Sequence, residues 1–323
     1  MKDKLQILTE KGEQVEALAP VIVSASRSTD IPAFYAQWFI HRLKVGYVIW
    51  YNPFNRQPMY ISFNNTKVVV FWSKNPLPLI PLLKELDDRG IHYDFQFTMN
   101  DYDKEGFEPN VPPLQKRIET FKELSTLIGR EKIIWRFDPL IVTPTLSPRD
   151  LLKKIWNIGN QIKGCTDKLV FSFIDIKAYR KVQRNMIKET KLFSKENIEN
   201  AEFTEWQMHE IADGLAKIRT HWKQEGWELS LATCAEEIDL KPYGIEHNRC
   251  IDGELIKRIS AGEINNLSFP KDKGQRKMCG CTISKDIGSY NTCSHFCIYC
   301  YANTSKEMVE KNRHAQSVPV TVL

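Results

Sequence analysis

The chain has 323 residues, of which 42% are hydrophobic, enough apolar material for one large domain or two modest ones. Its 8 Trp, 16 Phe and 11 Tyr exclude a disordered chain. The formal net charge of +5, from 45 basic and 40 acidic residues, permits a nucleic-acid partner without indicating one, because the basic residues appear spread along the chain. The N-terminus lacks an apolar signal segment and the longest apolar runs are only strand-sized, so we expect a cytoplasmic protein with no membrane span.

Short apolar strands alternate with helical stretches along most of the chain. The expected strands are Val21–Ser26, Tyr47–Tyr51, Val68–Trp72, Tyr93–Thr98, Ile133–Phe137, Leu169–Ile174 and Leu229–Thr233. The expected helices are Ala33–Lys44, Leu79–Asp88, Leu114–Leu127, Pro148–Ile162 and Thr204–Glu225. The strands lack polar alternation, as buried parallel strands do.

This rhythm of strands and helices predicts an α/β fold, specifically a (β/α) TIM-type barrel in complete, partial or circularly permuted form. We expect the barrel to occupy residues 1–265. The cysteine-rich segment 266–323 should close the barrel and pack on its C-terminal face, within one integrated domain. Residues 53–67 break the rhythm, and we expect an extra hairpin or short strand there.

Polar and charged residues follow every expected strand. In a barrel these positions lie on the C-terminal face, where functional groups gather. Lys74, Arg136, Asp138 and Asp175 are therefore candidate catalytic residues. The alternative is that such residues only cap helices or occupy polar loops, which fits Lys and Arg less well than Asp and Asn.

Seven of the eight cysteines lie between Cys234 and Cys300. Cys293, Cys297 and Cys300 form a C-x-x-x-C-x-x-C triplet close to the end of the chain. Three thiolates leave one iron of a four-iron cubane open, whereas structural zinc takes four protein ligands. We therefore favour a 4Fe–4S cluster with an open iron. The alternative is a zinc site with His295 or Cys281 as its fourth ligand.

The other four cysteines of this region are Cys234, Cys250, Cys279 and Cys281. Four thiolates can close a second 4Fe–4S cluster or one tetrahedral zinc site. Cys234 ends the last expected strand, on the face where the triplet must lie. A second 4Fe–4S cluster near the first is the favoured interpretation. The alternatives are a zinc site, or that Cys234 and Cys250 are ordinary buried cysteines.

Family resemblances rest on these motifs. The pattern Cys293-x-x-x-Cys297-x-Tyr299-Cys300 resembles the radical S-adenosylmethionine motif, and C-x-H-x-C-x-Y-C-Y-A-N is similar to the cluster loop of the spore photoproduct lyase branch. Nearly the full chain resembles an uncharacterised bacterial family of unknown function, through SxSRxTDIPAF, FWSKNP, WRFDP and CGCxxSxDIGxYxxC.

The radical-enzyme resemblance implies that the triplet ligates three irons and that the fourth iron binds S-adenosylmethionine. One electron, from a donor such as flavodoxin or ferredoxin, would then yield a 5′-deoxyadenosyl radical. The backbone around Tyr299 would contact the adenine. A circular permutation would reconcile the late triplet with the usual early one, and would place Ser26, Arg27 and Asp30 where the cofactor's amino group is held. Alternatively, Asp30 caps the helix that begins near Pro32.

Three functions therefore stay open. The first is a radical enzyme that acts on an unknown small molecule or nucleic acid. The second is a non-radical iron–sulfur or zinc protein with a regulatory or nucleic-acid-binding role. The third is a metal-independent barrel hydrolase that uses Arg136, Asp138, Glu236 or Glu237. The basic run Lys271–Lys277 is either a solvated loop or a phosphate site.

Overall fold

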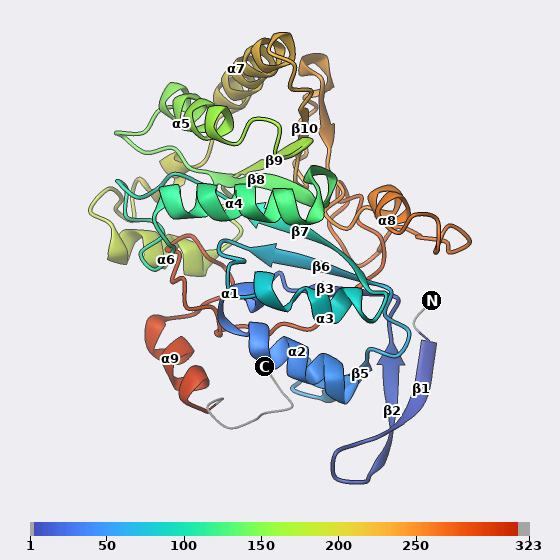
Figure 1. Ribbon diagram of the computed structural model, residues 1–323. Coiled ribbons are helices and arrows are strands. Elements are labelled where there is room, and N and C mark those ends of the chain that lie inside the picture. Colours follow the sequence, from blue (N-terminus) through green and yellow to red (C-terminus); the bar gives the residue numbers. More distant parts are fainter. Residues whose placement is uncertain (1–2, 316–323) are drawn as a thin grey trace.

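The computed structural model describes residues 3–315 and shows an α/β protein with two sheets (Figure 1). The larger sheet has eight strands, all paired in parallel, in the order β11-β10-β9-β8-β7-β6-β3-β12. We call it the main sheet. Its strands are β3 (Ile22–Ala25), β6 (Val68–Ser73), β7 (His92–Thr98), β8 (Ile133–Leu140), β9 (Lys168–Phe173), β10 (Ser230–Thr233), β11 (Ile245–His247) and β12 (Lys285–Asp286).

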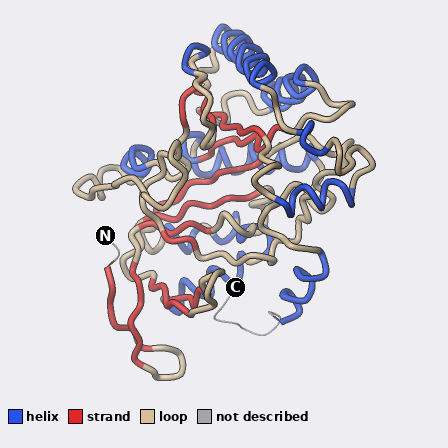
Figure 2. The backbone as a smooth tube through the Cα atoms, turned by 180° about the vertical axis from the view of Figure 1, so that it is seen from behind, coloured by secondary structure: helices blue, strands red, loops and turns tan. Residues whose placement is uncertain are grey.

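The main sheet is open, so the predicted barrel is wrong. Its edge strands β11 and β12 contain only three and two residues, and within residues 3–315 they pair with one neighbour each and not with one another. The tube in Figure 2 shows the strands as one twisted layer. Alternation of strands and helices specifies parallel pairing but not closure, because closing a sheet also needs a matched tilt and stagger of the edge strands.

The smaller sheet explains why the strand count was misleading. It has the order β1-β2-β5-β4, with β1 at Asp3–Leu8, β2 at Gln14–Ala19, β4 at Tyr47–Tyr51 and β5 at Pro58–Ser62. The expected strand Tyr47–Tyr51 therefore exists but lies outside the main sheet. The expected hairpin is confirmed, since β5 pairs antiparallel with β4. The hairpin of β1 and β2 was not predicted.

The helices agree in part with the sequence. The α-helices are α1 (Ile31–Phe34), α2 (Ala36–Val45), α3 (Lys84–Asp87), α4 (Leu114–Ile128), α5 (Pro148–Gln161), α6 (Arg180–Glu189), α7 (Glu205–Gln224), α8 (Gly253–Ile259) and α9 (Lys306–Ala315). Short 3-10 turns cover Ile80–Leu82, Arg130–Lys132, Ile198–Ala201 and Lys241–Tyr243. The expected helix Ala33–Lys44 is thus interrupted at Tyr35, and α6 and α8 were not predicted. Among residues 3–315, no helix is long and apolar enough to cross a membrane.

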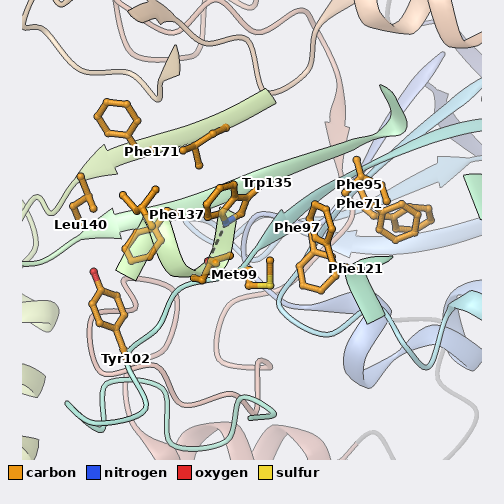
Figure 3. Close-up of a cluster of buried hydrophobic side chains, with 14 of the residues drawn as sticks. Phe71, Phe95, Phe97, Met99, Tyr102, Phe121, Trp135, Phe137, Leu140 and Phe171 are labelled. Carbon is orange, nitrogen blue, oxygen red and sulfur yellow. Dashed lines mark hydrogen bonds between the residues drawn. The ribbon is translucent and has the colours of Figure 1, made fainter. Parts of the chain in front are cut away.

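The core lies against the central strands of the main sheet (Figure 3). Aromatic side chains of β6, β7 and β8 pack together there, and the Trp135 indole donates a hydrogen bond to the Met99 carbonyl at 3.1 Å. Because helices and loops cover both faces, these strands carry apolar residues without alternation. The labelled members of the cluster are Phe71, Phe95, Phe97, Met99, Tyr102, Phe121, Trp135, Phe137, Leu140 and Phe171.

The end of the chain returns to its beginning. Strand β12 pairs in parallel with β3, with Lys285 opposite Val23 and Asp286 opposite Ser24. The segment assigned to a separate cysteine-rich region therefore contributes a strand to the main sheet itself. The triplet loop leaves β12 at the same edge at which residues 26–30 leave β3, and α9 follows that loop. The expected last strand, Leu229–Thr233, does not lie beside β3; the neighbour of β3 at this edge is β12, which was not predicted.

Candidate functional site

The triplet loop runs from β12 to α9 and buries its three thiols. Cys297 is buried, and Cys293 and Cys300 are half-buried. Burial raises the pKa of Cys293 to about 12 and also raises the pKa of Cys297 and Cys300, because a buried thiolate loses its hydration. Repulsion adds to the rise at Cys293, from Asp30 and Cys300, and at Cys297, from Glu108 and the other two thiols. These thiols therefore need a cation, such as bound metal, to become thiolates at neutral pH.

Asp30 ties the triplet loop to the main sheet. Its carboxylate accepts hydrogen bonds from the backbone N–H of Ala33 and Lys74, at 3.0 and 2.7 Å, and from the Ser73 hydroxyl at 2.7 Å. The His295 Nε2 lies 2.8 Å from Asp30 Oδ2, the same oxygen that accepts from the Lys74 backbone. A carboxylate offers about four lone-pair positions, so Asp30 has none left for a ligand. The expected capping role is confirmed, since Asp30 is the N-cap residue of α1.

Ser26 and Arg27 are fixed to β12 through Asp286. The Asp286 carboxylate accepts from the Ser26 hydroxyl at 2.7 Å and from the Arg27 backbone N–H at 2.9 Å. The Arg27 carbonyl in turn accepts from the Tyr301 hydroxyl at 3.4 Å. A Cβ on Gly288 would lie 1.8 Å from the Ser26 Oγ, so only glycine allows this close approach. The turn after β3 and the triplet loop form one unit.

The Tyr299 side chain enters a buried ionic network beneath the triplet. Its hydroxyl donates to the Glu108 carboxylate and accepts from Lys74 Nζ at 2.9 Å and from Asn100 Nδ2 at 3.1 Å. Lys74 Nζ lies 2.7 Å from Glu108 Oε1, with the two side chains 14% and 0% exposed, and Arg117 lies 3.7 Å from Oε2. Burial alone would raise the pKa of Glu108, but Lys74 and Arg117 outweigh it and lower the pKa to about 2. The candidate Lys74 is therefore held in an ion pair.

Glu108 and Arg117 were not predicted as site residues. Glu108 lies in the stretch GFEPN between β7 and α4, where no strand end points to it. Its position between Phe107 and Pro109 was a weak signal, because a carboxylate that is buried in an apolar setting needs a cationic partner.

The remaining four cysteines come together at the carboxyl ends of β10 and β11, and we call them the four-cysteine group. The Cys234 and Cys250 sulfurs are 3.4 Å apart. The Cys281 thiol interacts with both Cys250 and Cys279. No hydrogen bond in the described chain joins a triplet thiol to this group. The seven cysteines thus divide into three and four.

Two members of the four-cysteine group have a lowered pKa: a hydrogen bond with Cys281 lowers the pKa of Cys279 to about 6, and the pKa of Cys250 is lowered further. The Cys250 sulfur accepts from Arg136 Nη1 at 3.2 Å and Asn248 Nδ2 at 3.3 Å. Hydrogen bonds from Cys234 and Cys281 and the positive charge of Arg136 outweigh burial and lower the pKa of Cys250 well below its usual range. Thiolates are the form that binds metal.

Two arginines face this group. Arg136 is 2% exposed, and although burial disfavours its charge, Cys250 and Asp138 raise its pKa. Arg27 interacts electrostatically with Cys281 and Cys250 and lies 5.3 Å above the Trp72 ring. Two guanidinium charges beside several thiols form a strongly anion-stabilising pocket.

Asp138 forms an ion pair with Arg136. Its carboxylate accepts from Arg136 Nη2 at 2.5 Å and from the Ser172 hydroxyl. Its backbone N–H donates to the Asn100 Oδ1 at 2.8 Å. The candidate pair Arg136 and Asp138 is therefore a buried ion pair that presents its free guanidinium edge to Cys250.

The last candidates lie on the rim of the four-cysteine group. Asp175 is 3.5 Å from Arg276, which belongs to the basic run, and Arg276 donates to the Tyr179 hydroxyl at 2.7 Å. The Glu236 carboxylate accepts from the backbone N–H of residue 173 at 3.0 Å, and burial raises its pKa to about 7, with Asp138 as a further cause. Glu237 is exposed.

The donor groups do not form a site for one ion. Among residues 3–315, no three His, Cys, Asp or Glu side chains are arranged to hold a single metal ion. A tetrahedral zinc site requires its ligands to converge on one point. Each thiolate of an iron–sulfur cubane binds a different iron, so such thiolates surround a volume instead. The two cysteine groups supply the ligand type that such a cluster needs, with three thiols in one group and four in the other.

Fold and site together define a class: an open-sheet α/β protein that gathers two buried cysteine groups at the carboxyl edge of a parallel sheet. The family described as "Domain of unknown function (DUF1848)" matches residues 22–302, and the chain belongs to this family. The matched range includes both cysteine groups. Comparison with curated proteins and with solved structures found no match.

Proposed function

We propose that this protein is a radical S-adenosylmethionine enzyme with a second iron–sulfur cluster. The observation that carries the proposal is the division of the cysteines into a buried group of three and a separate group of four. Three thiolates without a fourth protein ligand leave one iron free to bind a small molecule. Four thiolates complete a second cluster by themselves.

In this proposal, Cys293, Cys297 and Cys300 hold a 4Fe–4S cluster. When bound with S-adenosylmethionine, this group supplies reductive cleavage of the sulfonium to a 5′-deoxyadenosyl radical, which abstracts hydrogen from a substrate. Placement of the triplet loop directly after a strand that pairs with β3 supports this role, because parallel α/β sheets bind ligands at their carboxyl edge.

The chain's own residues provide rigidity and charge. Asp30 and His295 fix the triplet loop, and the Tyr299 network anchors its last turn under Cys300. At the other group, four thiolates with a 4Fe–4S core in its oxidised state, or with Zn²⁺, carry a net charge of about −2. Arg27 and Arg136 offset part of that charge, since Arg136 is also paired with Asp138. Iron–sulfur is preferred to zinc because soft thiolates suit the iron of a sulfide cluster.

The test is the metal content and spectroscopy of protein prepared without oxygen. We expect about eight irons with matching sulfide, an electron paramagnetic resonance signal after reduction that shifts on addition of S-adenosylmethionine, and release of 5′-deoxyadenosine. Cys297→Ala should remove about half of the iron and abolish the shift. Cys250→Ala should remove the other half and retain the shift.

Cys165→Ala is the matched control, because this cysteine lies outside both groups and should leave iron and spectrum unchanged. Recovery of zinc alone, or a spectrum that ignores S-adenosylmethionine, would refute the proposal. Loss of all iron in either single variant would show one shared site instead of two.

A further inference from the structure

The net positive charge of the chain is concentrated in one segment. Residues 177–191 contain six basic residues and one acid, Glu189, which gives +5; the remaining residues hold 39 basic and 39 acidic side chains and sum to zero. We call the six basic residues the basic α6 surface: Lys177, Arg180, Lys181, Arg184, Lys188 and Lys191.

All six of these side chains are exposed, whereas the opposite face of α6 buries Val182 and Met186. Lys177 forms ion pairs with Glu199 and Glu202, and Lys188 pairs with its neighbour Glu189. Arg180 and Lys181 make no hydrogen bond or ion pair with the part of the chain that the structure describes. The exposed positive charge of this surface therefore rests mainly on the region of Arg180 and Lys181.

The basic α6 surface lies beside the end of the triplet loop. Lys181 interacts electrostatically with Cys300, and Arg184 donates to the carbonyl of Thr304 at 3.0 Å. Figures 1 and 2 both show α6 and α9 on the same side of the molecule. Tyr301, the residue after Cys300, is 40% exposed and stacks on Tyr179 at the start of α6, with ring centroids 5.4 Å apart.

We propose that the basic α6 surface and Tyr301 form the docking site of an acidic one-electron carrier protein, which reduces the triplet cluster. This inference rests on the proposed function. In the reduction the carrier loses one electron and the cluster gains it, and no other group is consumed. The site fits this partner because the exposed Tyr301 brings the surface within one residue of a cluster thiolate, and because opposite charge speeds a transient encounter.

A nucleic acid fits this surface less well. The six basic residues lie on α6, a helix of ten residues about 15 Å long, and just beside it, with Lys177 before the helix and Lys191 after it. A short surface of this kind suits the small interfaces of weak electron-transfer contacts. Recognition of a single strand also uses a groove with successive stacking aromatics. Here Tyr179 and Tyr301 already stack on each other.

The experiment compares reduction of the cluster by two donors. Arg180→Glu with Lys188→Glu reverses two charges of the basic α6 surface and leaves Lys181, the residue near Cys300, in place. Lys217→Glu with Lys223→Glu on α7 is the matched control, since both side chains are exposed and α7 lies far from α9 in both views. Reduction is followed by stopped-flow absorbance with reduced flavodoxin and, separately, with dithionite.

At about 0.01 M salt we expect the α6 variant to accept electrons from flavodoxin at least about tenfold more slowly than the native protein. The difference should vanish at about 1 M salt, where charges are screened beyond about 3 Å. Dithionite reduction and the midpoint potential of the cluster should not change, and the α7 variant should behave as native.

Equal flavodoxin rates for the native protein and the α6 variant, with normal dithionite reduction, would overturn the docking site and leave the proposed function standing. An equal loss in the α7 variant would do the same. If the α6 variant loses binding of a fluorescent single-stranded oligonucleotide but keeps its flavodoxin rate, the partner is a nucleic acid instead. If dithionite reduces no cluster, both the proposed function and the docking site fail.

Discussion

Replacement of Lys74 by Met tests the ionic network beneath the triplet. Met keeps the length and most of the volume of the side chain but removes the charge that lies 2.7 Å from Glu108. The Glu108 side chain has no solvent exposure, so its carboxylate would remain buried with only Arg117 at 3.7 Å. Removing one partner of a buried ion pair costs about 3–5 kcal/mol.

The pKa of Glu108 gives an independent magnitude. A fall from the ordinary value of 4.5 to about 2 corresponds to about 3 kcal/mol, at 1.36 kcal/mol for each factor of ten. Because the folded pKa is the lower one, this stability is complete above about pH 4.5 and is lost as the pH falls toward 2. Because Arg117 remains, we expect Lys74→Met to lower the free energy of unfolding by about 3 kcal/mol at pH 7 and by clearly less at pH 3.

Urea unfolding followed by tryptophan fluorescence at pH 7 and pH 3 measures both values. Lys84→Met is the control, because Lys84 forms a lysine–carboxylate pair with Asp88 at 2.5 Å whose side chains are 79% and 59% exposed. The control should show no measurable loss. A loss for Lys74→Met no larger than the control, or one that is the same at both pH values, would refute the reasoning.

Three further substitutions test other parts of the structure. Burial raises the pKa of Asp94 in the folded protein from 3.8 to about 7, so the stability of the native protein falls as the pH rises between these values. Asn does not titrate, so the effect of Asp94→Asn on the free energy of unfolding should be more favourable at pH 8 than at pH 5, by about 3 kcal/mol. An equal effect at both pH values would contradict this. Gly288→Ala should lower the melting temperature, with a loss of about 1–3 kcal/mol, because its Cβ would meet the Ser26 hydroxyl; an unchanged melting curve would show that the turn can relax. Arg136→Met should lower the iron content as well as stability, because Cys250 loses a donor at 3.2 Å, and Arg136→Lys should restore part of both; normal iron in Arg136→Met would separate the arginine from the four-cysteine group.

Local elements were predictable where the apolar pattern was strong. The central strands of the main sheet were recognised because Val68–Ser73 and Ile133–Leu140 are buried and rich in β-branched and aromatic residues. The sheet to which a strand belongs could not be predicted, because Tyr47–Tyr51 has the same kind of composition but pairs in the smaller sheet. Helix α6 was missed because its two buried positions, Val182 and Met186, are too few to give a helical period among so many charges.

The candidate site was predictable at the cysteines and much less so around them. Thiol spacing is a local property and indicated the triplet, whereas the other four cysteines, which extend from Cys234 to Cys281, were grouped only because they remained. The partners of Asp30 could not be predicted, because His295 is separated from it by most of the chain and approaches only through the pairing of β12 with β3. Glu108 and Lys74 likewise meet only once β6 and the loop after β7 are packed together.

The open sheet changes how the two cysteine groups are connected. A closed barrel would have brought the triplet beside β3 through the joined edges of the sheet. Here β12, a strand of two residues, brings the triplet loop beside β3. The Asp286 carboxylate of β12 stabilises this pairing by accepting hydrogen bonds from the Ser26 hydroxyl and the Arg27 backbone N–H. Arg27 then has two roles: its carbonyl accepts from Tyr301 of the triplet loop, and its guanidinium interacts with the four-cysteine group. A substitution at Arg27 therefore changes interactions with both groups.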